Sequence, residues 1–126
     1  RVGMIRHYPA QGQNLFMGAM HLRTLFKRLP LYRGSEHIVQ NERTVTLFEG
    51  EYRGVPLPAY VVQIGSRGVN AIDSHYRVGD QVERGAVFGM IRIGSQVDLI
   101  VPARDELTTQ VRPGDTVRAG ETILVQ

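Results

Sequence analysis

The chain of 126 residues has the length of a single domain, and its 42% hydrophobic and 21% charged residues are typical of a globular fold. The absence of cysteine excludes disulfides and thiolate metal sites, and no apolar stretch is long enough for a membrane-spanning helix. The formal charge of +3 comes almost entirely from arginine, since Lys27 is the only lysine. Arginine suits anionic lipid or nucleic acid, but zinc-finger spacing and basic runs with interleaved aromatics are missing, so no nucleic acid is expected as a partner.

The N-terminal part of the chain predicts one strand and one helical segment. Residues Val2–Tyr8 favour a short strand, which the turn cluster Pro9–Asn14 ends. The stretch Leu15–Leu29 mixes apolar and basic residues at a partly helical period, and Pro30 terminates it. We therefore expect one short N-terminal helical segment. It is either a basic amphipathic helix on anionic lipid or, as is commoner, a surface helix that packs its apolar face inward.

The middle of the chain predicts strands, with no helix after the N-terminal segment. A loop is expected over Tyr32–His37, because glycine and polar residues gather there. The alternation in Arg43–Phe48 indicates a half-buried strand that ends at Glu49–Glu51. A strand pattern also continues through Val69–Ile72.

The segment Val55–Ile64 is rich in β-branched and aromatic residues but contains two prolines, Pro56 and Pro58. Proline cannot donate a backbone hydrogen bond to a neighbouring strand. We therefore expect an irregular start, with a paired strand only from Ala59 or Tyr60 onward.

A weak internal repeat occupies the C-terminal third: Arg77–Gly85 is matched by Arg112–Gly120 at an offset of 35 residues. In each copy a Gly-Asp turn precedes a valine, and a second glycine precedes another apolar run. Two such turn-and-strand units are expected to pair around a pseudo-two-fold axis, with Val111–Val125 paired into the sheet. The pattern is typical of biotinyl and lipoyl carrier domains. We predict a mainly β fold, a β-sandwich of the barrel-sandwich-hybrid type with a Gly-Asp hairpin repeat, in a single domain over residues 1–126.

The dipeptide Gly94-Ser95 lies between two apolar strand-like runs, Phe88–Ile93 and Gln96–Leu99. Most Gly-Ser pairs are ordinary turns, since both residues favour turns. In this setting the pair also suits scission of the backbone by the serine hydroxyl, because glycine permits strained geometry and close approach to its carbonyl. Attack, β-elimination and loss of ammonia would leave a pyruvoyl group on the new N-terminus. Its ketone can act as an electron sink.

Several segments, taken in order, resemble the phosphatidylserine decarboxylase family of self-processing pyruvoyl enzymes. The resemblance covers most of the chain, and the order and spacing of the segments carry more weight than any one of them. The segments are Tyr8–Gly12 with Leu15-Phe16, the Asn-Glu-Arg block in Gln40–Val45, Val61–Ser66 with Val69–Ile72, and the glycine-flanked stretch Gly85–Ser95.

The resemblance implies a cut between Gly94 and Ser95, which gives a β chain of residues 1–94 and an α chain of residues 95–126. Ser95 would become the pyruvoyl cofactor, and the two cleaved chains would stay together through the sheet. The implied activity is that of a lyase, the decarboxylation of phosphatidylserine to phosphatidylethanolamine. The implied partners are a phosphatidylserine-type phospholipid and the membrane surface, at the cytoplasmic face of the cell membrane as a peripheral protein. A homodimer is left open.

Two departures from the family pattern bear on the chemistry. Ile93-Gly94-Ser95 is followed by Gln96, where one branch of the family has threonine, but the scissile pair is intact. The family's base for serine activation is an Asp-supported histidine just upstream of the position of Arg1, and a serine hydroxyl needs a base. We therefore expect this chain by itself to be incomplete and inactive, with the stretch before Arg1 supplying the base.

None of the four histidines of the chain is assigned as that base, because the reactivity of a histidine depends on partners that a sequence does not place. Asp73-Ser74-His75 is interpreted as a turn, since three adjacent residues rarely form a triad. Arg92 would share a sheet face with Gly94 in a regular strand and could then meet a phosphate or carboxylate, although a solvent-facing arginine is commoner. No metal site is expected. The histidines are His7, His21, His37 and His75.

The alternative function is that of a non-enzymatic module. Biotinyl and lipoyl carriers present a modifiable lysine on a hairpin, and Lys27 lies far from either hairpin of the repeat, which argues against attachment of biotin or lipoate. An uncleaved family member kept for binding is the stronger competitor. Replacement of Ser95 separates the two, because an enzyme would lose all turnover and a binding module would tolerate the change.

Overall fold

The computed structural model describes residues 1–17, 35–68, 71–92 and 96–126. These residues form two compact units. The first comprises Arg1–Met17 and Glu36–Pro102, and the described part of the second comprises Ser35 and residues 103–126. The described residues contain six strands in two antiparallel sheets and one short helix, and the strands do not close into a barrel. The predicted mainly β class is confirmed, and the single domain stays a prediction.

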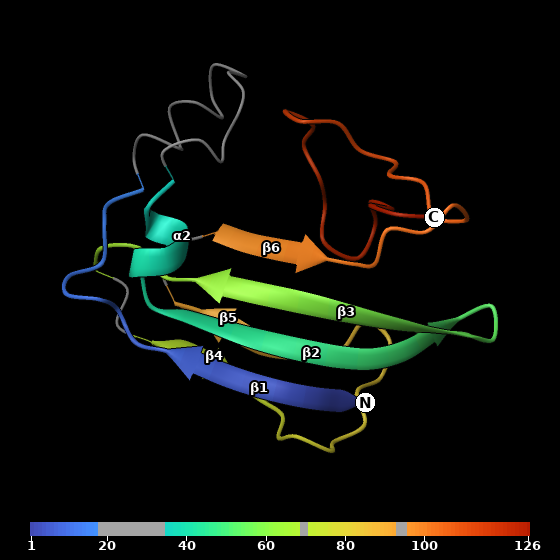
Figure 1. Cartoon of the computed structure of the whole chain (residues 1–126), viewed down its shortest axis with the longest axis horizontal. Coiled ribbons are helices and arrows are strands. Elements are labelled where there is room, and N and C mark those ends of the chain that lie inside the picture. The colour runs from blue at the N-terminus through green and yellow to red at the C-terminus, as the bar shows by residue number, and fades with distance from the viewer. Residues whose placement is uncertain (18–34, 69–70, 93–95) are drawn as a thin grey trace. The chain divides into compact units, whose positions relative to one another are not determined.

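The larger sheet has four strands in the order β1 (Val2–Tyr8), β2 (Arg43–Tyr52), β3 (Val55–Ile64) and β6 (Gln96–Ile100). All neighbours are antiparallel, and the strands lie side by side in Figure 1. The predicted bounds of β1 are confirmed.

The hairpin of β2 and β3 is longer than predicted. Its ladder runs from the pair of Arg43 and Ile64 to the pair of Tyr52 and Val55. The two residues that close it both have positive φ, 53° for Arg53 and 78° for Gly54, which matches the twist of a tight hairpin. The predicted end of the first strand at residues 49–51 is therefore wrong, because the two-residue turn lets pairing continue to the tip.

The expected irregular start of β3 is also wrong, since Pro56 pairs with Glu51 and Pro58 with Glu49. Two facts make the prolines tolerable. Both lie before Tyr60, where pairing with β6 begins, so β3 has only β2 as a neighbour there. Being two positions apart, their nitrogens face the same side of the strand. A proline nitrogen that faces an open edge costs no ladder bond.

The smaller sheet pairs β4 (Ile72–Ser74) with β5 (Gly89–Ile91) and lies behind the larger sheet in Figure 1. The rings of Phe48 and Phe88 meet edge to face at 5.0 Å between the sheets. The interpretation of residues 73–75 as a turn is wrong, because Asp73 and Ser74 belong to β4 and the His75 N–H bonds the Phe88 carbonyl. The side chains that line the space between the sheets are Val2, Ile5, Thr46, Phe48, Ser74, Tyr76 and Phe88.

The described helix, α2 (His37–Gln40), begins at the last residue of the loop expected over Tyr32–His37. Its turn is local, since the Glu36 carbonyl accepts hydrogen bonds from the N–H groups of Val39 and Gln40. The prediction that no helix follows Pro30 is thus wrong by one turn. The predicted helical segment over 15–29 lies outside the described residues from position 18 onward, as do residues 69–70 of the predicted strand.

The Gly-Asp repeat has the same turn in both copies. Asp80 Oδ2 accepts from the Arg77 N–H at 2.7 Å, and Asp115 Oδ2 accepts from the Arg112 N–H at 2.7 Å. The glycines before them have φ of 98° and 93°, a conformation that favours glycine. A strand over Val111–Val125 is not formed, because the described residues 103–126 contain one isolated bridge, between Thr109 and Val125, and no strand.

Candidate functional site

Gly94 and Ser95 lie outside the described residues, but both flanks of the pair are described. The upstream flank ends with Ile91 in β5 of the small sheet, and the downstream flank begins with Gln96 in β6 of the large sheet. The two strand-like runs of the sequence are therefore strands of different sheets. The Gly-Ser pair belongs to the link between them.

A chain of polar contacts reaches the residue directly after Ser95. His37 Nε2 lies 2.9 Å from Gln96 Oε1, and Gln96 Nε2 donates to Asp98 Oδ1 at 2.7 Å. His37 is 7% exposed at the start of α2, and Gln96 and Asp98 share one face of β6. The structure thus brings one of the four histidines to the edge of the predicted cleavage site.

The Asn-Glu-Arg block joins three segments of the first unit. Asn41 is fully buried, and its amide donates to the carbonyls of Gly65 at 2.8 Å and Leu15 at 3.1 Å. Its Oδ1 accepts from the Leu15 N–H at 2.7 Å. The guanidinium of Arg43 lies 4.6 Å from the centre of the Tyr8 ring and donates to the Val39 carbonyl. The matching segments of the sequence therefore meet around α2 and the ends of β1, β2 and β3.

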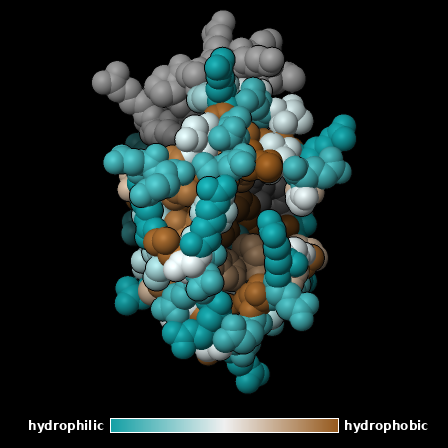
Figure 2. All heavy atoms as spheres, turned by 90° about the vertical axis from the view of Figure 1, so that its right-hand side faces the viewer, coloured by the Kyte–Doolittle hydropathy of each residue, from teal (hydrophilic) through white to brown (hydrophobic). Residues whose placement is uncertain are grey.

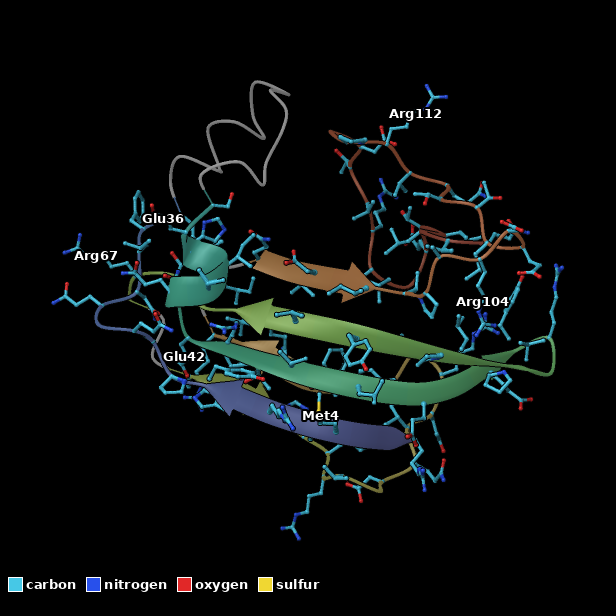
Figure 3. The ribbon with its side chains drawn as sticks, viewed as in Figure 1. Met4, Glu36, Glu42, Arg67, Arg104 and Arg112 are labelled. Atoms are coloured by element: carbon cyan, nitrogen blue, oxygen red, sulfur yellow. The ribbon has the colours of Figure 1, made fainter. Side chains whose placement is uncertain are left out.

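His7 makes a second polar cluster, on β1. Its Nδ1 lies 3.1 Å from Thr44 Oγ1, and its Nε2 lies 3.5 Å from a carboxylate oxygen of Glu42. Figure 3 shows Glu42 below α2, at this end of the sheet. The order hydroxyl, imidazole and carboxylate is that of a triad, but Thr44 is 2% exposed. A substrate cannot reach a hydroxyl buried to that extent, so the cluster fixes β1 against β2.

A buried acceptor without a partner lies against β5. Gln63 is 3% exposed, and its Oε1 has no hydrogen-bond donor in the described structure. The Gln63 amide approaches Gly89 so closely that a Cβ there would lie 3.3 Å from Oε1. Glycine at position 89 thus permits the amide to pack between the sheets, and Gln63 pairs with Val97, two positions after Ser95.

Arg92 is held by Asp73 of β4. Its Nε donates to Asp73 Oδ2 at 3.0 Å, and the hydrogen bond and charge of Asp73 raise the pKa of the guanidinium above its ordinary value. Arg92 lies beyond the end of β5, so the regular strand that would place it on one face with Gly94 stops at Ile91. Because its side chain remains 64% exposed, Arg92 is accessible to a phosphate or carboxylate.

The described ranges 1–17, 35–68, 71–92 and 96–126 contain no group of three or more His, Cys, Asp or Glu residues placed to hold a metal ion. They also contain no helix with the length and apolar character needed to cross a membrane.

The comparisons with known proteins agree on one family. The sequence profile described as phosphatidylserine decarboxylase matches residues 5–125, nearly the whole chain. The chain therefore belongs to the phosphatidylserine decarboxylase family, as its resemblance implied. No solved structure gives a significant match.

The curated relatives that are similar to this chain carry two names, archaetidylserine decarboxylase proenzyme and phosphatidylserine decarboxylase proenzyme. A protein of Methanopyrus kandleri, assigned as an archaetidylserine decarboxylase proenzyme, is 40% identical over 77% of this chain and 42% of its own length. A similarly assigned protein of Methanococcoides burtonii is 39% identical over 69% of this chain and 39% of its own length. The phosphatidylserine decarboxylase proenzyme of Chlorobium limicola is 56% identical over 38% of this chain and 22% of its own length. The chain spans about two fifths of the length of the first two relatives.

Sequence reasoning missed His37 and Gln96 as members of one site. They stand 59 positions apart, and nothing in the local sequence of either residue signals the contact. His21 and Lys27 lie outside the described residues. His75 is an exposed residue directly after β4, and no triad forms around it from Asp73 and Ser74, which are paired in the strand.

Proposed function

We propose that this chain is the part of a pyruvoyl-dependent decarboxylase that is cut between Gly94 and Ser95 and acts on a phosphatidylserine-type phospholipid. The observation that carries the proposal is the family match over residues 5–125, which includes an intact Gly-Ser pair. The strands on either side of the pair support it, because β5 and β6 are anchored in different sheets and would hold both new ends after a cut.

The proposed processing proceeds in balanced steps. The Ser95 hydroxyl, deprotonated by a base, attacks the Gly94 carbonyl, so that the amide C–N bond breaks and an ester C–O bond forms. Loss of the Ser95 Cα proton with departure of the Gly94 carboxylate then breaks the Cβ–O bond. Water replaces the nitrogen, which leaves as ammonia, and a ketone remains at position 95. Gly94 becomes the C-terminus of the β chain, and the α chain comprises residues 95–126.

The described flanks fit such a group. When present, a pyruvoyl ketone supplies an electron sink for loss of a carboxyl group from an amine substrate. Gln96, the neighbour of Ser95, is fixed by both the β3 ladder and His37. Gln63 Oε1 is a buried acceptor without a donor beside β5, and Arg92 is an exposed cation just upstream of the pair. Gln96 would position the group, Gln63 would offer it a hydrogen-bond acceptor, and Arg92 would offer a positive charge to an anionic headgroup.

The base for serine activation is proposed to be the histidine that the family resemblance implies upstream of the position of Arg1. The described histidines have other contacts: His7 lies against Thr44 and Glu42, His37 lies against the Gln96 amide, and His75 bonds the Phe88 carbonyl through its backbone.

The proposed substrate carries a phosphoserine headgroup, which is common to the two lipid names borne by the relatives. The excess of arginine suits the anionic surface of a membrane, and we propose a peripheral location on its cytoplasmic face. Stable association of the α and β chains is part of the proposal, because five residue pairs of the β3 and β6 ladder join residues on opposite sides of the cut.

The test is the intact mass of the full-length protein, compared with its Ser95→Ala variant. We expect two chains in the unmodified protein, with the smaller one lacking a free N-terminal amine and reacting with a carbonyl-trapping reagent such as a hydrazine. The Ser95→Ala variant should remain one chain and should lose decarboxylation of phosphatidylserine in vesicles by at least about a thousandfold, as expected for loss of a covalent catalytic group. Ser74→Ala, in β4, is the matched serine control. A single unmodified chain would instead support the uncleaved binding module.

A further inference from the structure

We infer that His37 is a positioning residue that clamps the start of the new α chain through Gln96. The inference rests on the proposed cleavage between Gly94 and Ser95, which would make Gln96 the second residue of that chain. The contact of His37 Nε2 with Gln96 Oε1 at 2.9 Å would then join two separate chains.

The direction of the hydrogen bond between His37 and Gln96 follows from the second contact of Gln96, with Asp98. The Asp98 side chain, as a carboxylate, can only accept, so the Gln96 amide must turn its NH₂ group toward Asp98, 2.7 Å away. Gln96 Oε1 therefore faces His37, whose Nε2 must carry the proton. Neutral and protonated imidazole can both provide an N–H at that nitrogen, so the clamp works in either charge state of His37.

The contact of His37 with Gln96 lies at the end of the β3 and β6 ladder, where strand pairing alone restrains the chain least. Gln96 pairs with Ile64 at the first position of the β3 and β6 ladder, and the end of a ladder has no further pair to hold it. New chain termini fray unless they are tied down. Ile64 is fully buried and His37 is 7% exposed, so both groups that hold Gln96 are themselves fixed by packing. A clamp here would restrain the residue directly after the proposed ketone.

The experiment compares His37→Leu with His37→Gln in the cleaved full-length protein. Leucine removes the donor, whereas glutamine restores an N–H donor on a side chain of comparable reach. In His37→Leu we expect amide hydrogen exchange over residues 96–100 to rise about tenfold, the loss of one buried hydrogen bond. We expect kcat to fall by a similar factor with KM within about twofold, because the change acts on the reacting position and not on headgroup binding. His37→Gln should recover both values, and His75→Leu should change neither.

Ser95→Ala separates this inference from the proposed function. If the unmodified protein is never cut, the proposed function fails, but faster exchange at residues 96–100 in Ser95→Ala/His37→Leu than in Ser95→Ala still supports the contact as a local restraint. If the protein is cut and His37→Leu leaves local exchange and kcat unchanged, the clamp is overturned while the proposed function stands. A rise in exchange across every strand would also overturn it, since that marks a general loss of stability. Should His37→Leu fail to fold, Gln96→Leu removes the acceptor instead, with the same expectations.

Discussion

Residues 103–126 and the sheets of the first unit differ in how much long-range pairing holds them. In the first unit, Asn41 joins Leu15 and Gly65 across 26 and 24 positions, and β2 pairs with β3 over their whole length. In residues 103–126, the turn bonds span three or four positions, as between Arg118 and Thr122, and long-range pairing is limited to the backbone bonds around the bridge of Thr109 and Val125. Most side chains of that region are exposed, and Figure 2 shows hydrophobic residues among hydrophilic ones on the surface.

The two copies of the Gly-Asp repeat show what this difference means for one motif. Both copies form the same local turn, closed by Asp80 and by Asp115. The first copy is also bound to β1, because the Asp80 carbonyl accepts from the Val2 N–H and the Gly79 N–H donates to the Val2 carbonyl. Val2 is 1% exposed. The turn of the first copy is therefore attached to a core strand. The turn of the second copy lies in residues 103–126, where the described pairing is the one bridge between Thr109 and Val125.

The largest loss of stability is expected for Asn41→Ala in the first unit. The change leaves the Leu15 N–H and the buried Gly65 carbonyl without this partner, and the Leu15 carbonyl keeps only the Arg67 N–H as a donor; an unsatisfied group costs about 1 kcal/mol or more. We expect the free energy of unfolding to fall by about 3 kcal/mol, measured by urea denaturation with strand circular dichroism as the signal.

Asn14→Ala is the matched control for that change. Asn14 Oδ1 accepts from the Glu42 N–H at 2.8 Å at a part-buried site, so its loss should cost about 1 kcal/mol. Equal losses for the two variants would mean that the Asn41 contacts do not hold the three segments together.

The sequence predicted elements whose signals are local and missed those set by distant partners. The bounds of β1 and both Gly-Asp turns were predictable, since strand composition and turn residues act over a few positions. The continuation of β3 through Pro56 was not predictable, because it depends on which neighbour lies on each side of the strand. The contact of His37 with Gln96 was not predictable either, because the two residues are 59 positions apart in the sequence. In addition, α2 is a single turn of four residues, too short to give a helical pattern in the sequence.

A smaller but clear loss is expected for Gly89→Ala, which tests how closely β4 and β5 approach each other in the smaller sheet. The added Cβ would lie 2.5 Å from the Asp73 carbonyl oxygen, which is backbone and cannot rotate away. Overpacking of this kind costs about 1 to 3 kcal/mol, and we expect about 2 kcal/mol by the same denaturation measurement. Gly50→Ala is the control, because a Cβ there comes no nearer than 3.7 Å to the Leu57 carbonyl oxygen. Similar stability of Gly89→Ala and the unmodified chain would show that β5 can shift away from β4 without cost.

The smallest effects should come from the repeat, where Asp80→Ala and Asp115→Ala remove the same hydrogen bond in two places. Loss of Asp80 should lower the free energy of unfolding of the sheets by about 1 kcal/mol, because the turn that it closes also binds Val2 of β1. Loss of Asp115 should lower it by less than about 0.3 kcal/mol and should instead speed amide exchange locally around Arg112, since residues 103–126 belong to a separate unit with little strand pairing, which can open without the sheets. Equal losses in the two variants would mean that residues 103–126 unfold together with the sheets. The difference between these two aspartates therefore measures how far an identical turn depends on the strand to which it is attached.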